Sequence, residues 1–129
     1  MPIRKTMAAH PAAAGHINEP LAETARIALD CSITATVCAD ACAAETVKMS
    51  QCIRSCLDAS DVCTATARLA VRQTGSNPLA LQAILRACIA ACDACADECE
   101  GHENPHCRLC AVACRECADD CREALEMLG

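Results

Sequence analysis

The chain has 129 residues, which is enough for one compact domain. It contains 15 cysteines but no Phe, Tyr or Trp, so it lacks the aromatic side chains on which the bases of RNA or single-stranded DNA stack. A formal net charge of -6 also disfavours binding to a phosphate backbone, and we therefore expect no nucleic-acid partner.

The N-terminal segment is a poor secretory signal, because His10 and Pro11 interrupt the apolar stretch that follows Arg4 and Lys5. No run approaches the roughly eighteen apolar residues of a membrane span. We therefore expect a cytoplasmic protein with no membrane partner. In a reducing cytosol, a high cysteine content favours metal or redox chemistry over a disulfide framework, and an odd number of cysteines cannot all pair within one chain.

Helix signals divide the chain into an N-terminal arm, residues 1–19, and a single helical domain, residues 20–129. A short helix over 3–9 is expected within the arm. The sequence Asn18-Glu19-Pro20 predicts the start of the first long helix, because an Asn N-cap followed by Pro is typical of helix N-termini. This helix is predicted to cover residues 20–44.

A second helix is predicted over residues 49–74. Neither Gly nor Pro occurs between 21 and 74, yet this segment is too long for one ordinary globular helix. We place the break near 44–49, where Thr46 and Val47 lower the helix propensity.

Two further turns combine a helix-ending Gly, an Asn N-cap and a Pro at the first helical position: Gly75-Ser76-Asn77-Pro78 and the segment 101–105. They predict helices over 78–100 and 105–127. Short connections favour antiparallel neighbours, so the predicted fold class is all-α, an up-down-up-down antiparallel four-helix bundle with a short N-terminal arm. The sequence contains no strand signal.

The cysteines recur at steps of three, four or seven residues, which places them on one face of each long helix. A seam with this spacing normally carries leucine and faces the inside of a bundle. We therefore expect a core lined with thiols. The residues are Cys31, Cys38 and Cys42 on the first long helix; Cys52, Cys56 and Cys63 on the second; Cys88, Cys92, Cys95 and Cys99 on the third; and Cys107, Cys110, Cys114, Cys117 and Cys121 on the fourth.

Counting from the turns predicts three layers of thiols. The top layer is Cys42, Cys52, Cys99 and Cys110 with Cys107 just above; the middle layer is Cys38, Cys56, Cys95 and Cys114; the bottom layer is Cys31, Cys63, Cys88, Cys92, Cys117 and Cys121. Below them, leucines such as Leu81 and Leu85 predict a closed, dry end. At the other end, His102 and His106 lie on or beside a polar loop near the uppermost thiols, which suits a metal entrance.

A single buried cysteine is usually a small apolar residue of the core. Fifteen of them on four inward faces favour metal binding instead, because Val or Ala would pack as well without being oxidised. Thiolates prefer Cu(I), Zn(II) and iron–sulfur clusters. Each tetrahedral Zn(Cys)4 site would bury a double negative charge, whereas Cu(I) bridged by thiolates gives a nearly neutral core. We therefore expect several Cu(I) ions, held by all fifteen cysteines together with His102 and His106.

The fourth long helix, His106-Cys-Arg-Leu-Cys-Ala-Val-Ala-Cys-Arg-Glu-Cys-Ala-Asp-Asp-Cys121, resembles the last helix of the cytosolic copper storage proteins. The segments Cys88–Cys99 and Cys38–Cys42 are similar to their counterparts in that family. The resemblance covers roughly 20–127. It implies a four-helix bundle that stores many Cu(I) ions, histidines near an open mouth, and assembly of the bundles as a homotetramer.

This chain departs from that pattern at four inward positions where further thiols could stand, namely Thr24, Ala28, Ala35 and Ala59. We therefore expect the lower part of the first long helix to be poorer in ligands than in the relatives. The departures affect the capacity for copper rather than the upper layers.

The sequence thus predicts a cytosolic protein that stores or buffers Cu(I) and is not an enzyme. Its expected partners are copper ions, other copies of the chain, and a copper chaperone or small-thiol copper donor. Two alternatives remain open at this point. One is an iron–sulfur or dithiol electron-transfer protein, for which Cys107 and Cys110 near a helix start are the nearest candidates. The other is a zinc buffer.

Overall fold

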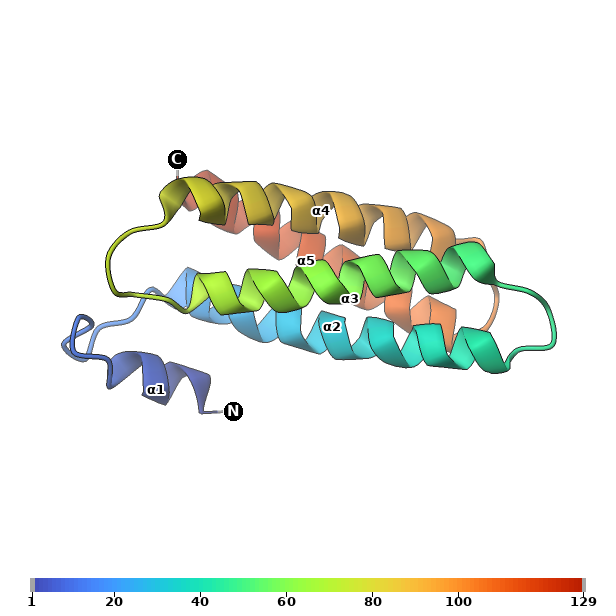
Figure 1. The fold of residues 1–129 in the computed structure, drawn as a ribbon, viewed down its shortest axis with the longest axis horizontal. Helices are drawn as coiled ribbons and strands as arrows, with labels where there is room; N and C mark the ends of the chain where they lie inside the picture. The colour runs from blue at the N-terminus through green and yellow to red at the C-terminus, as the bar shows by residue number, and fades with distance from the viewer. Residues whose placement is uncertain (1, 129) are drawn as a thin grey trace.

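Four long helices run alternately up and down the molecule, with a short helix beside one end (Figure 1). The computed structural model describes residues 2–128, and this part of the chain contains no strand. The helices are α1 (Ile3–Ala8), α2 (Glu19–Ala44), α3 (Ser50–Ala70), α4 (Pro78–Glu100) and α5 (Pro105–Leu128). The predicted four-helix bundle is confirmed.

The helix starts follow the local signals in the sequence. The Asn18 side chain accepts a hydrogen bond of 3.1 Å from the backbone N–H of Leu21, so α2 begins at Glu19, one residue before the predicted start. α2 ends at Ala44 because Glu45 adopts an extended conformation, with φ -70° and ψ 151°. The weakly marked break near 44–49 is therefore confirmed.

The end of α3 differs from the prediction, because this helix stops at Ala70 rather than at residue 74. Contacts with the arm explain the early end. Gln73 Nε2 donates a hydrogen bond of 3.0 Å to the carbonyl oxygen of Met7, and Thr74 Oγ1 lies 3.0 Å from His10 Nε2. Gly75 then turns the chain with a φ of +73°, which glycine adopts without strain.

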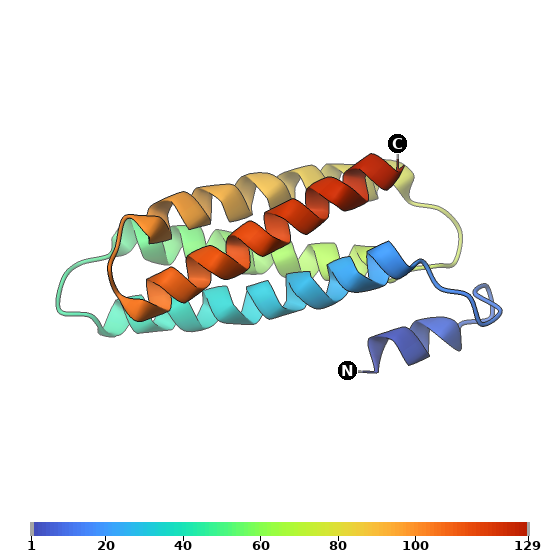
Figure 2. The same cartoon turned by 180° about the vertical axis from the view of Figure 1, so that it is seen from behind.

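Each long helix contacts two neighbours, so the bundle closes into a ring in the order α2, α3, α4 and α5 (Figure 2). A network of hydroxyl groups lies in the contact between α2 and α3. Ser32 Oγ lies 2.6 Å from Thr64 Oγ1, and Thr36 Oγ1 lies 2.7 Å from Ser60 Oγ. These pairs satisfy polar groups that the helix contact partly or wholly buries.

Leucines close the end of the bundle nearest the arm, as the sequence predicts. Leu85 is fully buried and Leu81 is nearly so, while Leu69 and Leu125 pack against the same core. The opposite end, formed by the turns at 45–49 and 101–104, carries no comparable leucine cluster. We call this opposite end the mouth.

Helices α2 and α4 are each long and apolar enough to cross a membrane by length and composition alone. This finding differs from the expectation that no segment approaches a membrane span. Alanine and cysteine account for much of the apolar character, and their inward members form the core of the bundle. The same test is passed by core helices of proteins without a membrane span.

Replacing Leu85 by Ala should destabilise the metal-free protein by about 2–5 kcal/mol, because it leaves a cavity at the leucine-closed end. Chemical denaturation followed by circular dichroism measures this change. Leu79 on the same helix is 81% exposed and provides the matched control. Equal stability of Leu85→Ala and Leu79→Ala would show that the leucines do not close this end.

Candidate metal centre

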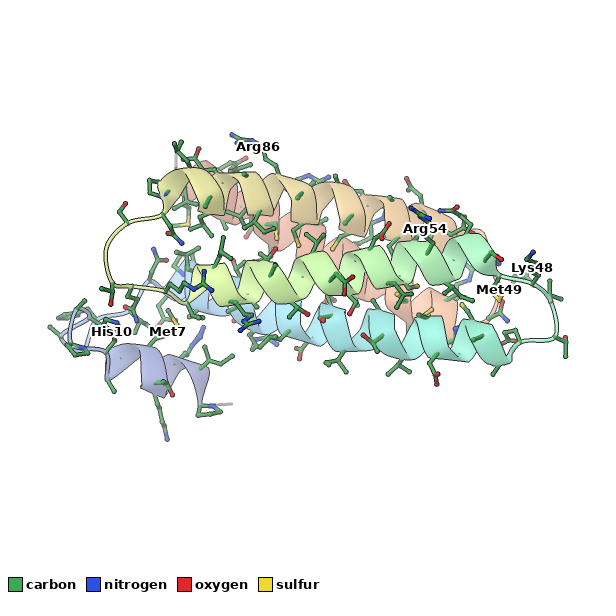
Figure 3. All side chains as sticks on the ribbon, viewed as in Figure 1. Met7, His10, Lys48, Met49, Arg54 and Arg86 are labelled. Carbon is green, nitrogen blue, oxygen red and sulfur yellow. The ribbon has the colours of Figure 1, made fainter. Side chains whose placement is uncertain are left out.

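All fifteen cysteine side chains point into the bundle, and none forms a disulfide. None of them is more than 2% exposed to solvent. Figure 3 shows sulfur atoms in the space between the four long helices. The expected convergence of four cysteine-bearing faces is therefore present, and the thiols form one column along the bundle axis.

The column begins at the mouth with a group of four possible ligands. The Sγ atoms of Cys38, Cys42 and Cys107 and a ring nitrogen of His106 all lie within 4.8 Å of one another. His106 Nδ1 is 3.3 Å from Cys38 Sγ and 3.6 Å from Cys107 Sγ. This group combines α2 with the start of α5, so the turn at 101–104 positions its histidine.

Two further groups with ligand atoms within 4.8 Å of one another continue from the mouth group: Cys38, Cys52, Cys56 and Cys99, then Cys56, Cys95, Cys99 and Cys110. Neighbouring groups share members, so one ion could be passed to the next without leaving sulfur. We call the cysteines of these three groups the upper set, which comprises Cys38, Cys42, Cys52, Cys56, Cys95, Cys99, Cys107 and Cys110.

The lower set lies nearer the leucine-closed end and consists of two groups that share Cys117. They are Cys31, Cys63, Cys92 and Cys117, and then Cys88, Cys117 and Cys121. The Sγ atoms of Cys63 and Cys92 are only 3.5 Å apart. These groups draw ligands from all four long helices.

The observed groups interleave where the sequence predicted separate layers. Cys38 belongs to the mouth group as well as to the group below it, and Cys110 lies with Cys56 and Cys95. Cys114 was expected beside Cys38 but lies 3.7 Å from Cys31. Helices in a bundle cross at an angle and their cysteines alternate steps of three and four, so equal residue counts from a turn do not give equal heights.

The two mouth histidines occupy different positions. His106 contacts thiols, whereas no thiol group formed by residues 2–128 includes His102. The His102 ring instead lies 2.7 Å, through Nε2, from a carboxylate oxygen of Glu98. The sequence places both histidines near the mouth, but only the three-dimensional arrangement distinguishes them.

Glu45 is a residue of the mouth that the sequence analysis did not single out. Its Oε1 atom lies 3.0 Å from His106 Nε2. Hydrogen bonds with His106 and then with Asn104 lower the pKa of the Glu45 carboxyl below its usual range. An ionised carboxylate only accepts hydrogen bonds, so Nε2 carries a proton and Nδ1, which faces the thiols, is the nitrogen available to a metal.

Burial favours the protonated form of three thiols near the mouth in the absence of metal. It raises the pKa of Cys38, Cys52 and Cys107 above that of a free cysteine, because a thiolate loses its hydration inside the bundle. A bound cation removes this penalty by neutralising the thiolate charge. The column is therefore suited to exchange protons for soft metal cations.

The four inward positions without a thiol lie where the sequence predicts. Thr24, Ala28, Ala35 and Ala59 are each at most 1% exposed. On α2 and α3 these residues occupy inward positions that offer no sulfur, which leaves α4 and α5 as the helices richest in ligands.

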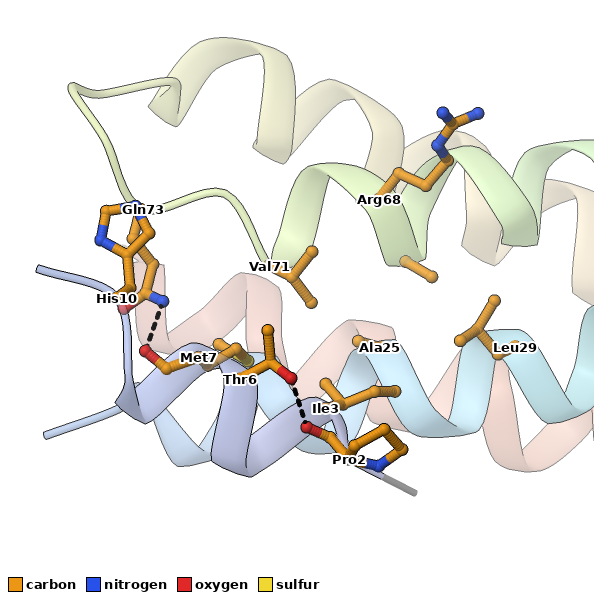
Figure 4. Close-up of a pocket in the computed structure, with 11 residues that line it drawn as sticks. Pro2, Ile3, Thr6, Met7, His10, Ala25, Leu29, Arg68, Val71 and Gln73 are labelled. Atoms are coloured by element: carbon orange, nitrogen blue, oxygen red, sulfur yellow. Dashed lines mark hydrogen bonds between the residues drawn. The ribbon is translucent and has the colours of Figure 1, made fainter. Parts of the chain in front are cut away.

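A mostly apolar cavity lies outside the thiol column. It has a volume of about 340 Å³ and lies between the arm and the ends of α2 and α3 (Figure 4). Ile3, Met7, Leu29 and Val71 supply much of its lining, and Gln73 bridges its two sides through the hydrogen bond to Met7. No cysteine lines this cavity.

Comparison with known proteins identifies related chains. The sequence profile of the copper storage protein family matches residues 17–126. A structure of the copper storage protein Ccsp from Streptomyces lividans, described as loaded with 10 copper equivalents, is similar with a TM-score of 0.90 and 40% identity, over 96% of this chain and 98% of that chain. No curated protein sequence matches this chain significantly.

Two further structures are similar over most of the bundle. One is described as copper loading to a cytosolic copper storage protein from Streptomyces lividans with five coppers; it has a TM-score of 0.84 and 43% identity over 86% of this chain and 96% of that chain. The other is a Streptomyces lividans Ccsp variant in which two histidines are replaced by alanine. It has a TM-score of 0.82 and 42% identity over 84% of this chain and 94% of that chain.

Replacing Glu45 by Ala should release His106 from a single tautomer, because Nε2 loses its acceptor. Nitrogen-15 NMR of the metal-free protein at neutral pH measures the change, with Nε2–H dominant in the unaltered protein and a mixture of tautomers in Glu45→Ala. Glu45→Gln keeps an acceptor oxygen and should retain Nε2–H, while Glu98→Ala should leave His106 unchanged. An unaltered tautomer in Glu45→Ala would contradict this role.

Proposed function

Because the chain belongs to the copper storage protein family, we propose that it stores several copper ions as Cu(I), bound by thiolates of its fifteen cysteines and by His106. The observation that carries the proposal is the column of thiol groups, in which the groups of each set share members and the ligand atoms of each group lie within 4.8 Å of one another. A column of this kind has room for many ions, whereas a structural site needs only one group of ligands.

The choice of Cu(I) rests on softness and charge. Sulfur ligands prefer soft cations, and monovalent copper accepts two or three thiolates that are shared with neighbouring ions. The filled core then approaches neutrality, which the surrounding alanines and leucines require. Zinc would leave a double negative charge at each four-thiolate site, and the thiols stand on long helices rather than on the short wrapping segments typical of iron–sulfur sites.

Copper is proposed to enter at the mouth and to be stored there without chemical conversion. His106 Nδ1 receives the ion beside Cys38 and Cys107, and the ion then moves to deeper thiolates by ligand exchange. A new bond to the sulfur of Cys38 or Cys107 displaces a proton from a thiol whose pKa burial has raised. The function is therefore storage and buffering rather than catalysis.

We place this activity in the cytosol, in line with the cytosolic description of the Streptomyces lividans relative. The proposed donor is a copper chaperone or a small-thiol copper complex. The proposed assembly is a homo-oligomer of bundles, and the family resemblance suggests a tetramer. Exposed apolar side chains on the contacting helices α2 and α5 support association: Ile33, Val37, Leu109 and Val112 are all more than half exposed.

Anaerobic titration of the reduced protein with Cu(I), against a competing chelator and with metal analysis, tests the proposed function. Binding should continue well beyond three ions per chain and give ultraviolet thiolate-to-copper bands on a background free of aromatic absorbance. Affinity should fall as the pH is lowered, because protons then compete with Cu(I) for the thiolates. Saturation at three or fewer ions would contradict storage, and a brown colour would indicate iron–sulfur binding instead.

The two mouth histidines should contribute unequally to copper uptake. His106→Ala should slow uptake several-fold without changing the final capacity appreciably, since the fifteen thiols remain. His102→Ala should have a smaller effect, because His102 contacts Glu98 and no thiol group. Stopped-flow measurement of the ultraviolet bands compares the two variants. A larger effect of His102→Ala would reverse the assignment of the first ligand.

A further inference from the structure

The upper and lower sets of cysteines are separate at the level of direct thiol contacts. Within residues 2–128, no group of ligand atoms contains members of both sets. Hydrogen-bonded thiol pairs also remain within one set, such as Cys56 with Cys99 in the upper set and Cys63 with Cys88 in the lower set. Cys114 is the one cysteine that belongs to neither set.

The separation has a cause in the sequence. On α2, the inward position between Cys31 and Cys38 is Ala35, and this alanine is fully buried. On α3, Ala59 occupies the corresponding position and is also fully buried. Two of the four helices therefore present a methyl group where the sets approach each other. We call this level the waist.

The other two helices keep sulfur close to the waist. Cys95 and Cys92 stand on α4 at a step of three, but they belong to the upper and the lower set respectively. Between Cys110 and Cys117 on α5 stands Cys114, which is fully buried. Cys114 is therefore placed between the sets along the bundle axis.

Cys114 interacts with both sets. Below the waist, its Sγ atom lies 3.7 Å from that of Cys31. Above the waist, Cys110 precedes Cys114 by four residues on the same face of α5, and both side chains are fully buried. The partners of Cys114 therefore lie on both sides of the waist.

We propose that the protein holds copper in two clusters, one in each set of cysteines, and that Cys114 is the relay through which Cu(I) passes between them. The inference rests on the proposed storage function. In the transfer, Cu(I) bound by Cys95 and Cys110 exchanges Cys95 for Cys114 and then exchanges Cys110 for Cys31, so one bond forms for each bond that breaks. Copper stays monovalent. The thiols of Cys114 and Cys31 release two protons, and the two thiolates left behind, those of Cys95 and Cys110, take up protons or the next copper ions.

Replacing Cys114 by Ala separates the two clusters and tests the relay. Anaerobic Cu(I) uptake is followed by stopped-flow ultraviolet absorbance, and native mass spectrometry counts the ions at each stage. The variant should fill the upper set at the rate of the unaltered protein. Filling of the lower set should then be at least tenfold slower, which gives a plateau at partial occupancy.

Two matched variants separate the relay from the loss of one ligand. Cys121→Ala removes a thiol from the bottom of the lower set and should show no plateau. Adding Ala35→Cys to Cys114→Ala restores a thiol at the waist from α2, and this double variant should recover the fast filling. Circular dichroism of each metal-free variant establishes that the bundle is intact.

The location of the ions completes the test. Anomalous diffraction from copper in crystals of Cys114→Ala, prepared at the plateau, should place the ions in the upper set alone. Filling of the lower set at the unaltered rate, or copper in the lower set at the plateau, would overturn the relay while leaving storage intact. Failure of the unaltered protein to bind more than three ions would instead overturn the proposed function.

Discussion

An uncompensated thiolate is unfavourable inside this bundle, so the loss of a thiol proton is coupled to the binding of a cation. The interior offers thiolates little hydration, so charge can appear there only in pairs of opposite sign. This requirement accounts for the leucines that close one end, for the alanines along the helices, and for the carboxylate and imidazole groups at the mouth.

The requirement also explains why large apolar residues are scarce. A core of Phe or Leu throughout would bury more surface, but it would leave no room for ligands and ions. Here Leu85 and its neighbours pack one end, and the remaining length is filled by sulfur and methyl groups. The hydroxyl network between α2 and α3 gives these two helices a polar contact on the side away from the metal. Packing and binding are thus assigned to different parts of the same helices.

Much of this arrangement follows from sequence periodicity. Helix starts at Asn18, the Pro-marked turns and the inward direction of every cysteine are local properties, and all are confirmed. Properties that depend on helix crossing angles are not local. Counting residues placed Cys114 beside Cys38 rather than beside Cys31 and missed the early end of α3 against the arm. It also could not pair Glu45 with His106, which is distant in sequence. The sequence analysis looked for unbroken apolar runs. It therefore missed that α2 and α4, in which alanine and cysteine alternate with polar residues, are apolar enough on average to cross a membrane.

The leucine-closed end has a consequence for the order in which copper ions are released. If the bundle opens only at the mouth, the ions bound last are released first, and the ions bound earlier stay deeper in the column. Under the proposed function, the ions nearest His106 form a circulating supply, and those beside Cys121 form a reserve with a long residence time. Two chains carrying the same amount of copper can then differ in how quickly they release it, according to whether the ions lie near the mouth or near the leucine-closed end.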